Sequence, residues 1–173
     1  NWTFNVAGGA TSGSLVTTQV FRDPSAWYHI VCAIDTSLAT AANRMLMYVN
    51  GVQVTSFTTN TNPAQNATIW LGTSGLVNYI GRVSSSAIWF FDGYFAEYNV
   101  INGQQLTPSS FGYTDPSTGV WQPKAYTGTY GTNGFYLKFL DNSAATAATI
   151  GKDYSGNGNN SVSYTHLTLP TIL

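Results

Sequence analysis

The chain has 173 residues, of which only 8% are charged, and its formal net charge is −1. Without a basic patch or a polybasic segment, we expect neither nucleic acid nor a membrane as a partner. No stretch is apolar over the length that spans a bilayer, and the single cysteine, Cys32, excludes an intrachain disulfide. Aromatic residues make up 14% of the chain. Rings beside hydroxyls and amides suit neutral glycans, although composition alone does not select that ligand.

Residues 1–6 alternate polar and apolar side chains and predict a strand. A Gly- and Ser-rich loop follows at 7–14, and a second strand is predicted at 15–21. The first strand starts at once and the sequence has no initiator Met. We therefore expect the sequence to be truncated at its N-terminus.

The centre of the chain predicts a hairpin. Residues 27–34 and 44–49 are rich in aromatic and β-branched side chains, which favours strands. Asn50 and Gly51 come next, and both adopt positive φ readily, as the central positions of a type I′ turn require. We expect 44–49 to fold back on 52–57. Cys32 lies in the first of these strands and is expected to be a small buried side chain.

The rest of the chain predicts further short strands, at 69–71, 78–83, 87–91, 94–101 and 135–140. A polar loop at 58–66 precedes them, and residues 113–134 are expected to form an ordered loop. In the strand at 94–101, the small apolar side chains of Ala96 and Val100 mark the face expected to be buried. Short strands separated by turn residues predict an all-β, antiparallel β-sandwich.

Four sequence blocks resemble a known family. The pattern Trp-Tyr-His, a later Asp and a strand ending Tyr-Val-Asn-Gly resembles laminin-G-like members of the concanavalin A-like lectin/glucanase superfamily. More closely, FRDPSAWYHIVCAIDT…NRMLMYVNGVQVTSF resembles tailed-bacteriophage virion proteins that carry this jelly-roll domain. The likeness returns at FDGYFAEYNVINGQQLTPSSFG, GVWQPKAYTGTYGTNGF and GKDYSGNGNN, and covers about residues 19–160. It implies one jelly-roll domain over residues 1–160. Family members carry further strands before residue 1, so we expect the domain to lack one or two N-terminal strands.

The C-terminal end departs from that resemblance. The run DYSGNGNN resembles a turn near the start of laminin-G-like domains. Its place at the end of this chain fits either a circularly permuted sandwich or the start of a second module. Residues 161–173 break the family pattern and resemble the translated sequencing-adapter tail of metagenome-assembled reading frames, an artefact that would make the sequence a metagenomic fragment. The alternative is an ordinary terminal strand.

The resemblance implies a non-catalytic module of a phage tail or tail fibre, located in the virion. Its expected partners are a host-surface glycan or neighbouring virion subunits, and a homo-oligomer is compatible with either. A secreted, extracellular bacterial carbohydrate-binding or adhesion protein is the first alternative.

A glycoside hydrolase is the second alternative, because the superfamily includes such enzymes. Retaining hydrolysis needs two carboxylates about 5 Å apart. The sole Glu is Glu97, and its neighbours at even spacing, Phe95 and Asn99, are not acids. The two histidines, His29 and His166, are too few for a zinc cluster or a convincing triad. We therefore expect no enzyme activity.

Loop aromatics and two polar neighbours are the candidate ligand-binding residues: Trp89, Asp92, Asn102, Tyr113, Trp121, Tyr126 and Tyr130. For each ring a packing role is an equally good interpretation. Trp89 would then lie in the core, and Trp121 would pin its long loop to the sandwich.

Calcium is the one cofactor that the resemblance raises, because related domains bind it through loop oxygens. Asp153, Asn157 and Asn159 offer such oxygens. Asn-Gly runs are more often simple turns, and we favour that interpretation.

Overall fold

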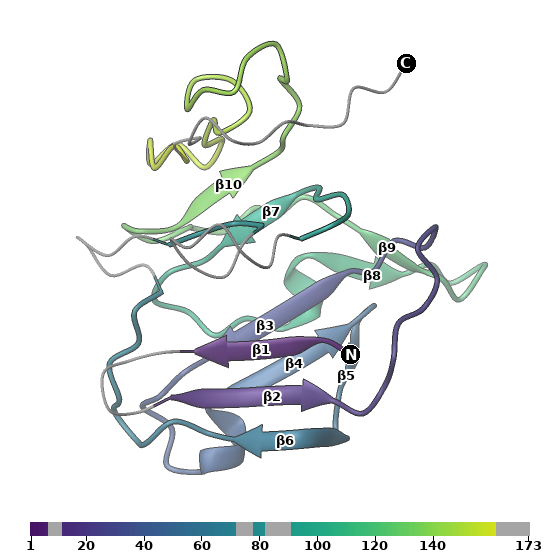
Figure 1. Cartoon of the computed structure of the whole chain (residues 1–173), viewed down its shortest axis with the longest axis vertical. Coiled ribbons are helices and arrows are strands. Elements are labelled where there is room, and N and C mark those ends of the chain that lie inside the picture. Colours follow the sequence, from purple (N-terminus) through teal and green to yellow (C-terminus); the bar gives the residue numbers. More distant parts are fainter. Residues whose placement is uncertain (7–11, 72–77, 82–90, 162–173) are drawn as a thin grey trace. The chain divides into compact units, whose positions relative to one another are not determined.

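The computed structural model describes residues 1–6, 12–71, 78–81 and 91–161 (Figure 1). Over these ranges the regular structure consists of short strands and two single-turn 3₁₀ helices. Their bounds are β1 Thr3–Val6, β2 Gly13–Thr17, β3 Ile30–Ile34, η1 Ala41–Asn43, β4 Met45–Val49, β5 Val52–Gln53, β6 Phe57–Thr61, β7 Tyr98–Val100, η2 Pro108–Ser110, β8 Gly112–Thr114, β9 Trp121–Pro123 and β10 Phe135–Leu137. The strand pairs in the sheets are antiparallel, which confirms the predicted all-β fold class. Within these ranges, no helix combines the length and apolar character needed to cross a membrane.

The chain forms two compact units, which we describe separately. The first comprises Asn1–Thr73 and Gln104–Gly128, and the second comprises Ser74–Gly103 and Thr129–Leu173. The strands β1 to β6, β8 and β9 belong to the first unit, and β7 and β10 belong to the second.

Two three-stranded sheets pack against each other in the first unit. Their strand orders are β1-β2-β6 and β3-β4-β5, and Figure 1 shows β1, β2 and β6 side by side. Val6 and Leu15 come from the first sheet, and Met45 and Met47 come from β4 of the second. These four side chains are buried in one cluster. Alternate residues of a strand face the same side, so the cluster is the core of a β-sandwich.

The predicted central hairpin is present but short. Asn50 and Gly51 have φ of 48° and 80°, as the predicted turn requires. β4 pairs with β5 over two positions, and after Gln53 the chain crosses to the other sheet. There β6 pairs with β2, so the predicted polar loop at 58–66 is wrong over its first residues. β6 is a Thr-rich edge strand exposed along most of its length, and such a strand has no apolar alternation to reveal it.

Cys32 is exposed, contrary to expectation. It pairs with Met47 and faces the same side of the sheet, but β3 is the outer strand and is covered less completely than β4. Neighbouring atoms still desolvate the thiol and raise its pKa to about 12. The thiol therefore stays protonated and unreactive at neutral pH.

The sequence predicted one long ordered loop at 113–134, but this region contains a hairpin. β8 pairs with β9, with Gly112 opposite Pro123 and Thr114 opposite Trp121. The connection is a turn at Asp115, where the backbone N–H of Gly119 donates to the Asp115 carbonyl at 2.8 Å. Three-residue strands with no buried apolar row are too short for periodicity to predict.

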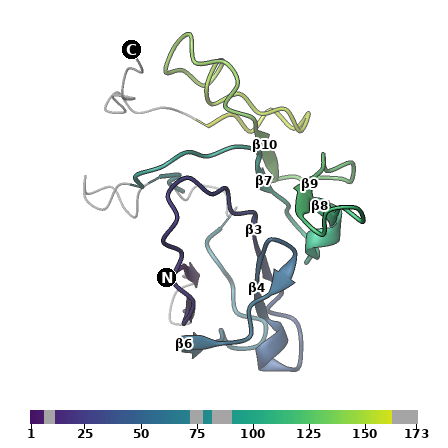
Figure 2. The same ribbon diagram turned by 90° about the vertical axis from the view of Figure 1, so that its right-hand side faces the viewer.

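The second unit contains the β7–β10 pair (Figures 1 and 2). Tyr136 lies opposite Asn99 in this pair. Both strands are shorter than predicted. Glu97 has a φ of 54° and Phe139 a φ of 55°, so left-handed backbone limits β7 and β10 near these residues. Ala96 is exposed, and the prediction that it faces a core is wrong.

The remaining predicted strands have mixed outcomes. Residues 69–71 are irregular, so that prediction is wrong, and residues 78–81 are not a strand either. Residues 82–90, which include most of the strand predicted at 87–91, lie outside the described ranges.

Candidate functional site

A pocket of about 440 Å³ lies in the first unit, between the chain that follows β2 and the β4–β5 turn with the crossover that follows β5. Its volume is within the range of small-molecule sites. Hydroxyls, amides, aromatic rings and valines line it, and no lining residue is charged. We call it the neutral pocket.

Hydrogen bonds and ring contacts build the walls of the neutral pocket. Thr18 donates from its backbone N–H to the Ser56 carbonyl at 3.2 Å and from its hydroxyl to Ser56 Oγ at 2.9 Å. These bonds tie the chain after β2 to the crossover. Phe21 and Tyr28 meet edge to face with ring centroids 5.1 Å apart, and Trp2 supports Phe21 at 6.1 Å. Phe21 and Tyr28 form the aromatic wall of the pocket, and the Trp2 ring packs against it.

Several polar groups of the neutral pocket are free to bind a ligand. The side chains of Gln19, Tyr28, Gln53 and Thr55 form no hydrogen bond with any residue that the structure describes. Two primary amides, a phenol and a hydroxyl can both donate and accept. Beside apolar rings and valines, this set suits an uncharged ligand that carries many hydroxyls. The lining contains no carboxylate or histidine that could act as a general acid or base.

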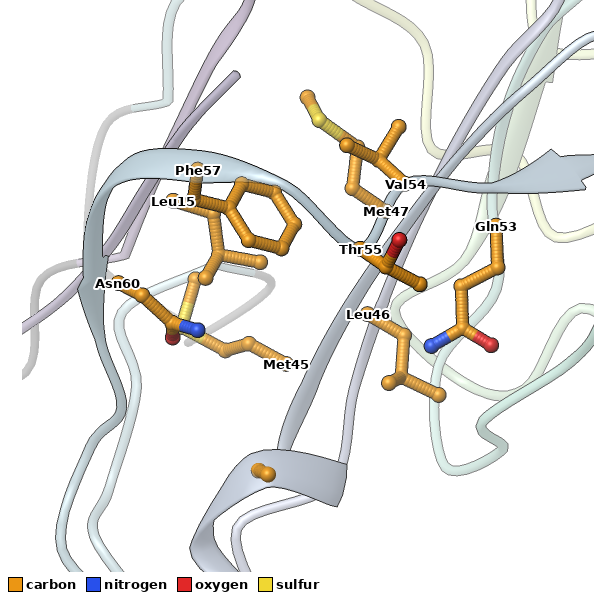
Figure 3. A pocket seen from close by; sticks show the side chains of 10 residues that line it. Leu15, Met45, Leu46, Met47, Gln53, Val54, Thr55, Phe57 and Asn60 are labelled. Atoms are coloured by element: carbon orange, nitrogen blue, oxygen red, sulfur yellow. The ribbon is translucent and has the colours of Figure 1, made fainter. Parts of the chain in front are cut away.

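A smaller cavity of about 170 Å³ lies on the other side of the crossover. Figure 3 shows Leu15, Met45, Met47 and Phe57 around it, together with the polar side chains of Gln53 and Asn60. Its apolar lining includes three residues of the buried core. Because it is smaller than most ligand sites, we interpret it as an opening in the packing.

The ligand-binding residues predicted from the sequence lie elsewhere. Tyr113, Trp121 and Tyr126 belong to the first unit, whereas Asp92, Asn102 and Tyr130 belong to the second. Trp89 lies outside the described residues. The six described residues do not line the neutral pocket. The pocket residues themselves were missed because they come from a turn, a strand end and a crossover that share no sequence motif.

Trp121 packs in the way that the alternative interpretation proposed. A Cβ built on Gly51 would come within 2.3 Å of its indole ring, and one built on Gly112 would come within 2.4 Å. The His29 ring lies 5.6 Å away, centroid to centroid. Trp121 therefore holds the β8–β9 hairpin against the β4–β5 turn. The other two rings of this unit differ: Tyr126 lies 5.2 Å from Phe111, and Tyr113 is exposed.

His29 behaves as a packing residue. Burial lowers the pKa of its imidazole, which is therefore neutral at pH 7. Its backbone N–H donates to Asn50 Oδ1, and its carbonyl accepts from the Asn50 N–H, both at 2.8 Å. Its Nδ1 is buried without a hydrogen-bond partner in the described structure. These contacts fix the turn at Asn50 and leave His29 no catalytic partner among the described acids.

In the second unit, the predicted residues join a hydrogen-bonded network. The Asn102 N–H donates to the Tyr130 carbonyl at 2.9 Å, and the Tyr130 hydroxyl donates to Asn99 Oδ1 at 2.9 Å. Asp92 is exposed. Beside these residues, the Tyr136 hydroxyl donates to the carboxylate of Glu97.

The proposed calcium ligands form a turn. Asp153 Oδ1 accepts from the N–H groups of Tyr136 and Ser155, and Oδ2 accepts from the Ser155 hydroxyl and the Asn159 N–H, all at 2.8–2.9 Å. The amides of Asn157 and Asn159 donate to backbone carbonyls of residues 131–134. These hydrogen bonds account for the placement of the three side chains without a bound cation, and we derive no metal chemistry from them. Among the described residues, no group of three His, Cys, Asp or Glu side chains is placed to hold a metal.

Asp153 is one of five aspartates in the same local motif, Asp-x-Ser. In each, the Asp carboxylate accepts from the N–H and the hydroxyl of the serine two residues later. The pairs are Asp23–Ser25, Asp35–Ser37, Asp115–Ser117, Asp141–Ser143 and Asp153–Ser155. The serine hydrogen bonds lower the pKa of the first four carboxyls. Burial alone would raise the pKa of Asp153, but hydrogen bonds from Tyr136, Ser155 and Asn159 lower it overall.

Comparison with known families gives one result. Residues 1–110 match a laminin G family model that is described as the concanavalin A-like lectin/glucanases superfamily. Comparisons with curated proteins and with solved structures gave no match. The matched range includes every strand of the two three-stranded sheets and every residue that lines the neutral pocket.

Proposed function

Because this chain belongs to the concanavalin A-like lectin/glucanase superfamily, a family of jelly-roll sandwiches, we propose that it is a non-catalytic carbohydrate-binding module. Its ligand is a neutral glycan held in the neutral pocket. The observation that carries this proposal is the uncharged lining of that pocket, in which free amides and hydroxyls surround an aromatic wall.

The dimensions and chemistry of the pocket support a sugar ligand. A volume of about 440 Å³ lies in the range of sites that hold small molecules. The rings of Phe21 and Tyr28 offer apolar surface to the C–H face of a sugar. The amides of Gln19 and Gln53 can each donate to one sugar hydroxyl and accept from another.

The placement of the acids supports a binding role without catalysis. Hydrolysis would need two carboxylates on either side of a bound sugar. Five aspartates are engaged in Asp-x-Ser turns, and Glu97 accepts from the Tyr136 hydroxyl. No carboxylate lines the neutral pocket. A sugar bound there would meet hydrogen-bonding groups but no acid.

The biological setting that we propose is a tail or tail-fibre protein of a bacteriophage virion. The order of the four sequence blocks described above supports it. In that setting the module contacts glycans of the host surface. A secreted carbohydrate-binding or adhesion protein would use the same pocket, and genomic neighbours that encode capsid or tail parts would favour the virion.

A glycan array followed by titration calorimetry tests the proposal. We expect the full chain to bind neutral oligosaccharides, and Gln53→Ala or Tyr28→Ala to weaken that binding on the order of tenfold, through lost hydrogen bonds or lost ring contact. Gln122→Ala removes an amide of the same unit outside the pocket and should leave affinity unchanged.

Two outcomes would contradict the proposal. The first is equal affinity in the pocket variants and the control. The second is a folded chain that binds no neutral glycan and forms oligomers in solution, a result that would favour contact between virion subunits instead.

A further inference from the structure

Three tyrosine rings form a row on one face of the β7–β10 pair in the second unit. Tyr136 lies opposite Asn99 in the pairing, and its strand neighbours Phe135 and Leu137 face the other side. The Tyr130 ring is nearly parallel to Tyr136, with centroids 6.2 Å apart, and Tyr154 meets Tyr136 at 6.5 Å and 66°. We call these three rings the tyrosine row.

Two ammonium groups lie near Tyr154, at one end of the tyrosine row. Lys138 Nζ lies 5.3 Å from the centroid of Tyr136 and 5.0 Å from that of Tyr154. Lys152 Nζ lies 5.0 Å from Tyr154. The whole chain has only six Lys and Arg residues, so a third of its cationic side chains surround one ring.

Neither ammonium group forms an ion pair with an acid among the described residues. The carboxylate of Asp153 is taken up by its four donors, and Lys152 influences Asp141 only as the weakest cause of its lowered pKa. Tyr154 is 38% exposed, and Lys152 is exposed as well. A ligand from solution can therefore reach both the ring and the charges.

The other end of the row carries acceptors. Glu97 accepts from the Tyr136 hydroxyl, and Asn99 Oδ1 accepts from the Tyr130 hydroxyl at 2.9 Å. The row is thus polar along its length: both ammonium groups lie near Tyr154, Lys138 also lies near Tyr136, and carboxylate and amide oxygens lie beside the hydroxyls of Tyr136 and Tyr130. A ligand with one anionic group and several hydroxyls would match both ends.

We propose that the tyrosine row binds an acidic saccharide, such as a uronic acid. Its carboxylate lies between Lys138 and Lys152, and the apolar face of its ring packs on Tyr154. Ammonium groups recognise carboxylates through charge-assisted hydrogen bonds, and aromatic rings recognise the C–H face of a sugar. A neutral sugar would form no ion pair with the two ammonium groups, and a bare inorganic anion would have no apolar face to pack on the rings. This site is separate from the neutral pocket, and its ligand differs in charge.

Titration calorimetry of the full chain with three probes tests this proposal. The probes are an oligogalacturonate, a neutral galactose oligosaccharide of equal length and inorganic phosphate. We expect the oligogalacturonate to bind most tightly. Its affinity should fall as salt is added, because the charges are near the surface. The double variant Lys138→Gln/Lys152→Gln should lower its affinity by about tenfold or more. Lys124→Gln, in the first unit, should have no effect.

Two further variants separate the explanations. Tyr154→Ala, with its fold checked by near-UV circular dichroism, should weaken the binding of oligogalacturonate and leave any binding of phosphate unchanged. Gln53→Ala should weaken only the binding of a neutral glycan in the neutral pocket. If the neutral pocket binds no glycan, the test of the tyrosine row is therefore unaffected. Equal affinity for neutral and acidic probes would overturn the proposal, as would an equal loss in Lys124→Gln. Phosphate that binds as tightly as the oligogalacturonate would identify a site for bare anions and would also overturn it.

Discussion

The two units of the chain are stabilised by different interactions. In the first, two three-stranded sheets bury Val6, Leu15, Met45 and Met47 between them. In the second, the described strands are three residues long, and the segment that follows β10 is attached by hydrogen bonds of Asp153, Asn157 and Asn159 to residues 131–136. Apolar burial is the larger and less directional contribution, whereas a carboxylate with four donors depends on geometry and on charge. The first unit should therefore respond most to changes of side-chain volume, and the second most to changes of ionisation.

The largest expected effect comes from a cavity in the core of the first unit. Leu15→Ala should lower the free energy of unfolding by about 2–5 kcal/mol, because Leu15 is 2% exposed and its neighbours in the cluster are also buried. Leu137→Ala is the matched change in the second unit. We expect it to cost less, because Phe135, which faces the same side of β10 as Leu137, is only half-buried and can move into the space.

Urea denaturation and amide hydrogen exchange would measure both changes. Exchange resolves the units, and Leu15→Ala should speed exchange most in β2 and β4. If Leu137→Ala costs as much as Leu15→Ala, the contrast between the two units is wrong.

A smaller effect is expected at the turn that Trp121 covers. Gly51→Ala forces a Cβ into the indole ring at a residue whose φ is +80°. We expect a loss of about 2–3 kcal/mol, from left-handed strain of about 1 kcal/mol and from displacement of Trp121. Gly103→Ala is the control, since its φ is +83° but no atom lies within 4 Å of the added Cβ.

Gly103→Ala should therefore show the strain alone. Thermal unfolding followed by tryptophan fluorescence would compare the variants, with an emission shift expected only for Gly51→Ala. Equal losses would mean that Trp121 adjusts at no cost and that it does not pin the hairpin.

The turn and the apolar strands could be predicted from the sequence for a clear physical reason. Asn50 and Gly51 are chosen by backbone conformation, which depends on those two residues themselves. β4 has three buried residues out of five, and its apolar character marks it in any context. The family resemblance began in this same stretch, where local and long-range preferences agree.

The neutral pocket could not be predicted in this way. Gln19, Tyr28 and Gln53 are brought together by the crossover after β5 and by its hydrogen bonds to Thr18. That crossover depends on the pairing of β6 with β2, and β6 lacks the apolar alternation that would predict it. The tyrosine row was missed for a related reason: Tyr136 and Tyr154 are adjacent only because the Asp153 turn folds back on β10.

The smallest effect expected here concerns charge at that turn. Asp153→Asn replaces a carboxylate that accepts four hydrogen bonds with an amide whose nitrogen would face donors. We expect a loss of about 1–2 kcal/mol at pH 7. Because the folded pKa of Asp153 is lowered below 3.8, its stabilisation is fully present above that pH and disappears as the pH falls through the folded value. Wild type and variant should therefore converge in stability at acidic pH.

The convergence should appear in denaturation curves recorded between pH 7 and pH 2. Hydrogen exchange of β10 should lose its protection at higher pH than that of β4, since Asp153 accepts from the backbone N–H of Tyr136. Asp92→Asn, which changes an exposed acid outside the Asp-x-Ser turns, is the control and should follow the wild type throughout. A difference between Asp153→Asn and wild type that persists unchanged to pH 2 would mean that the amide fails by its shape and not by its missing charge. The second unit would then depend on packing as the first does, and the contrast between the two would no longer hold.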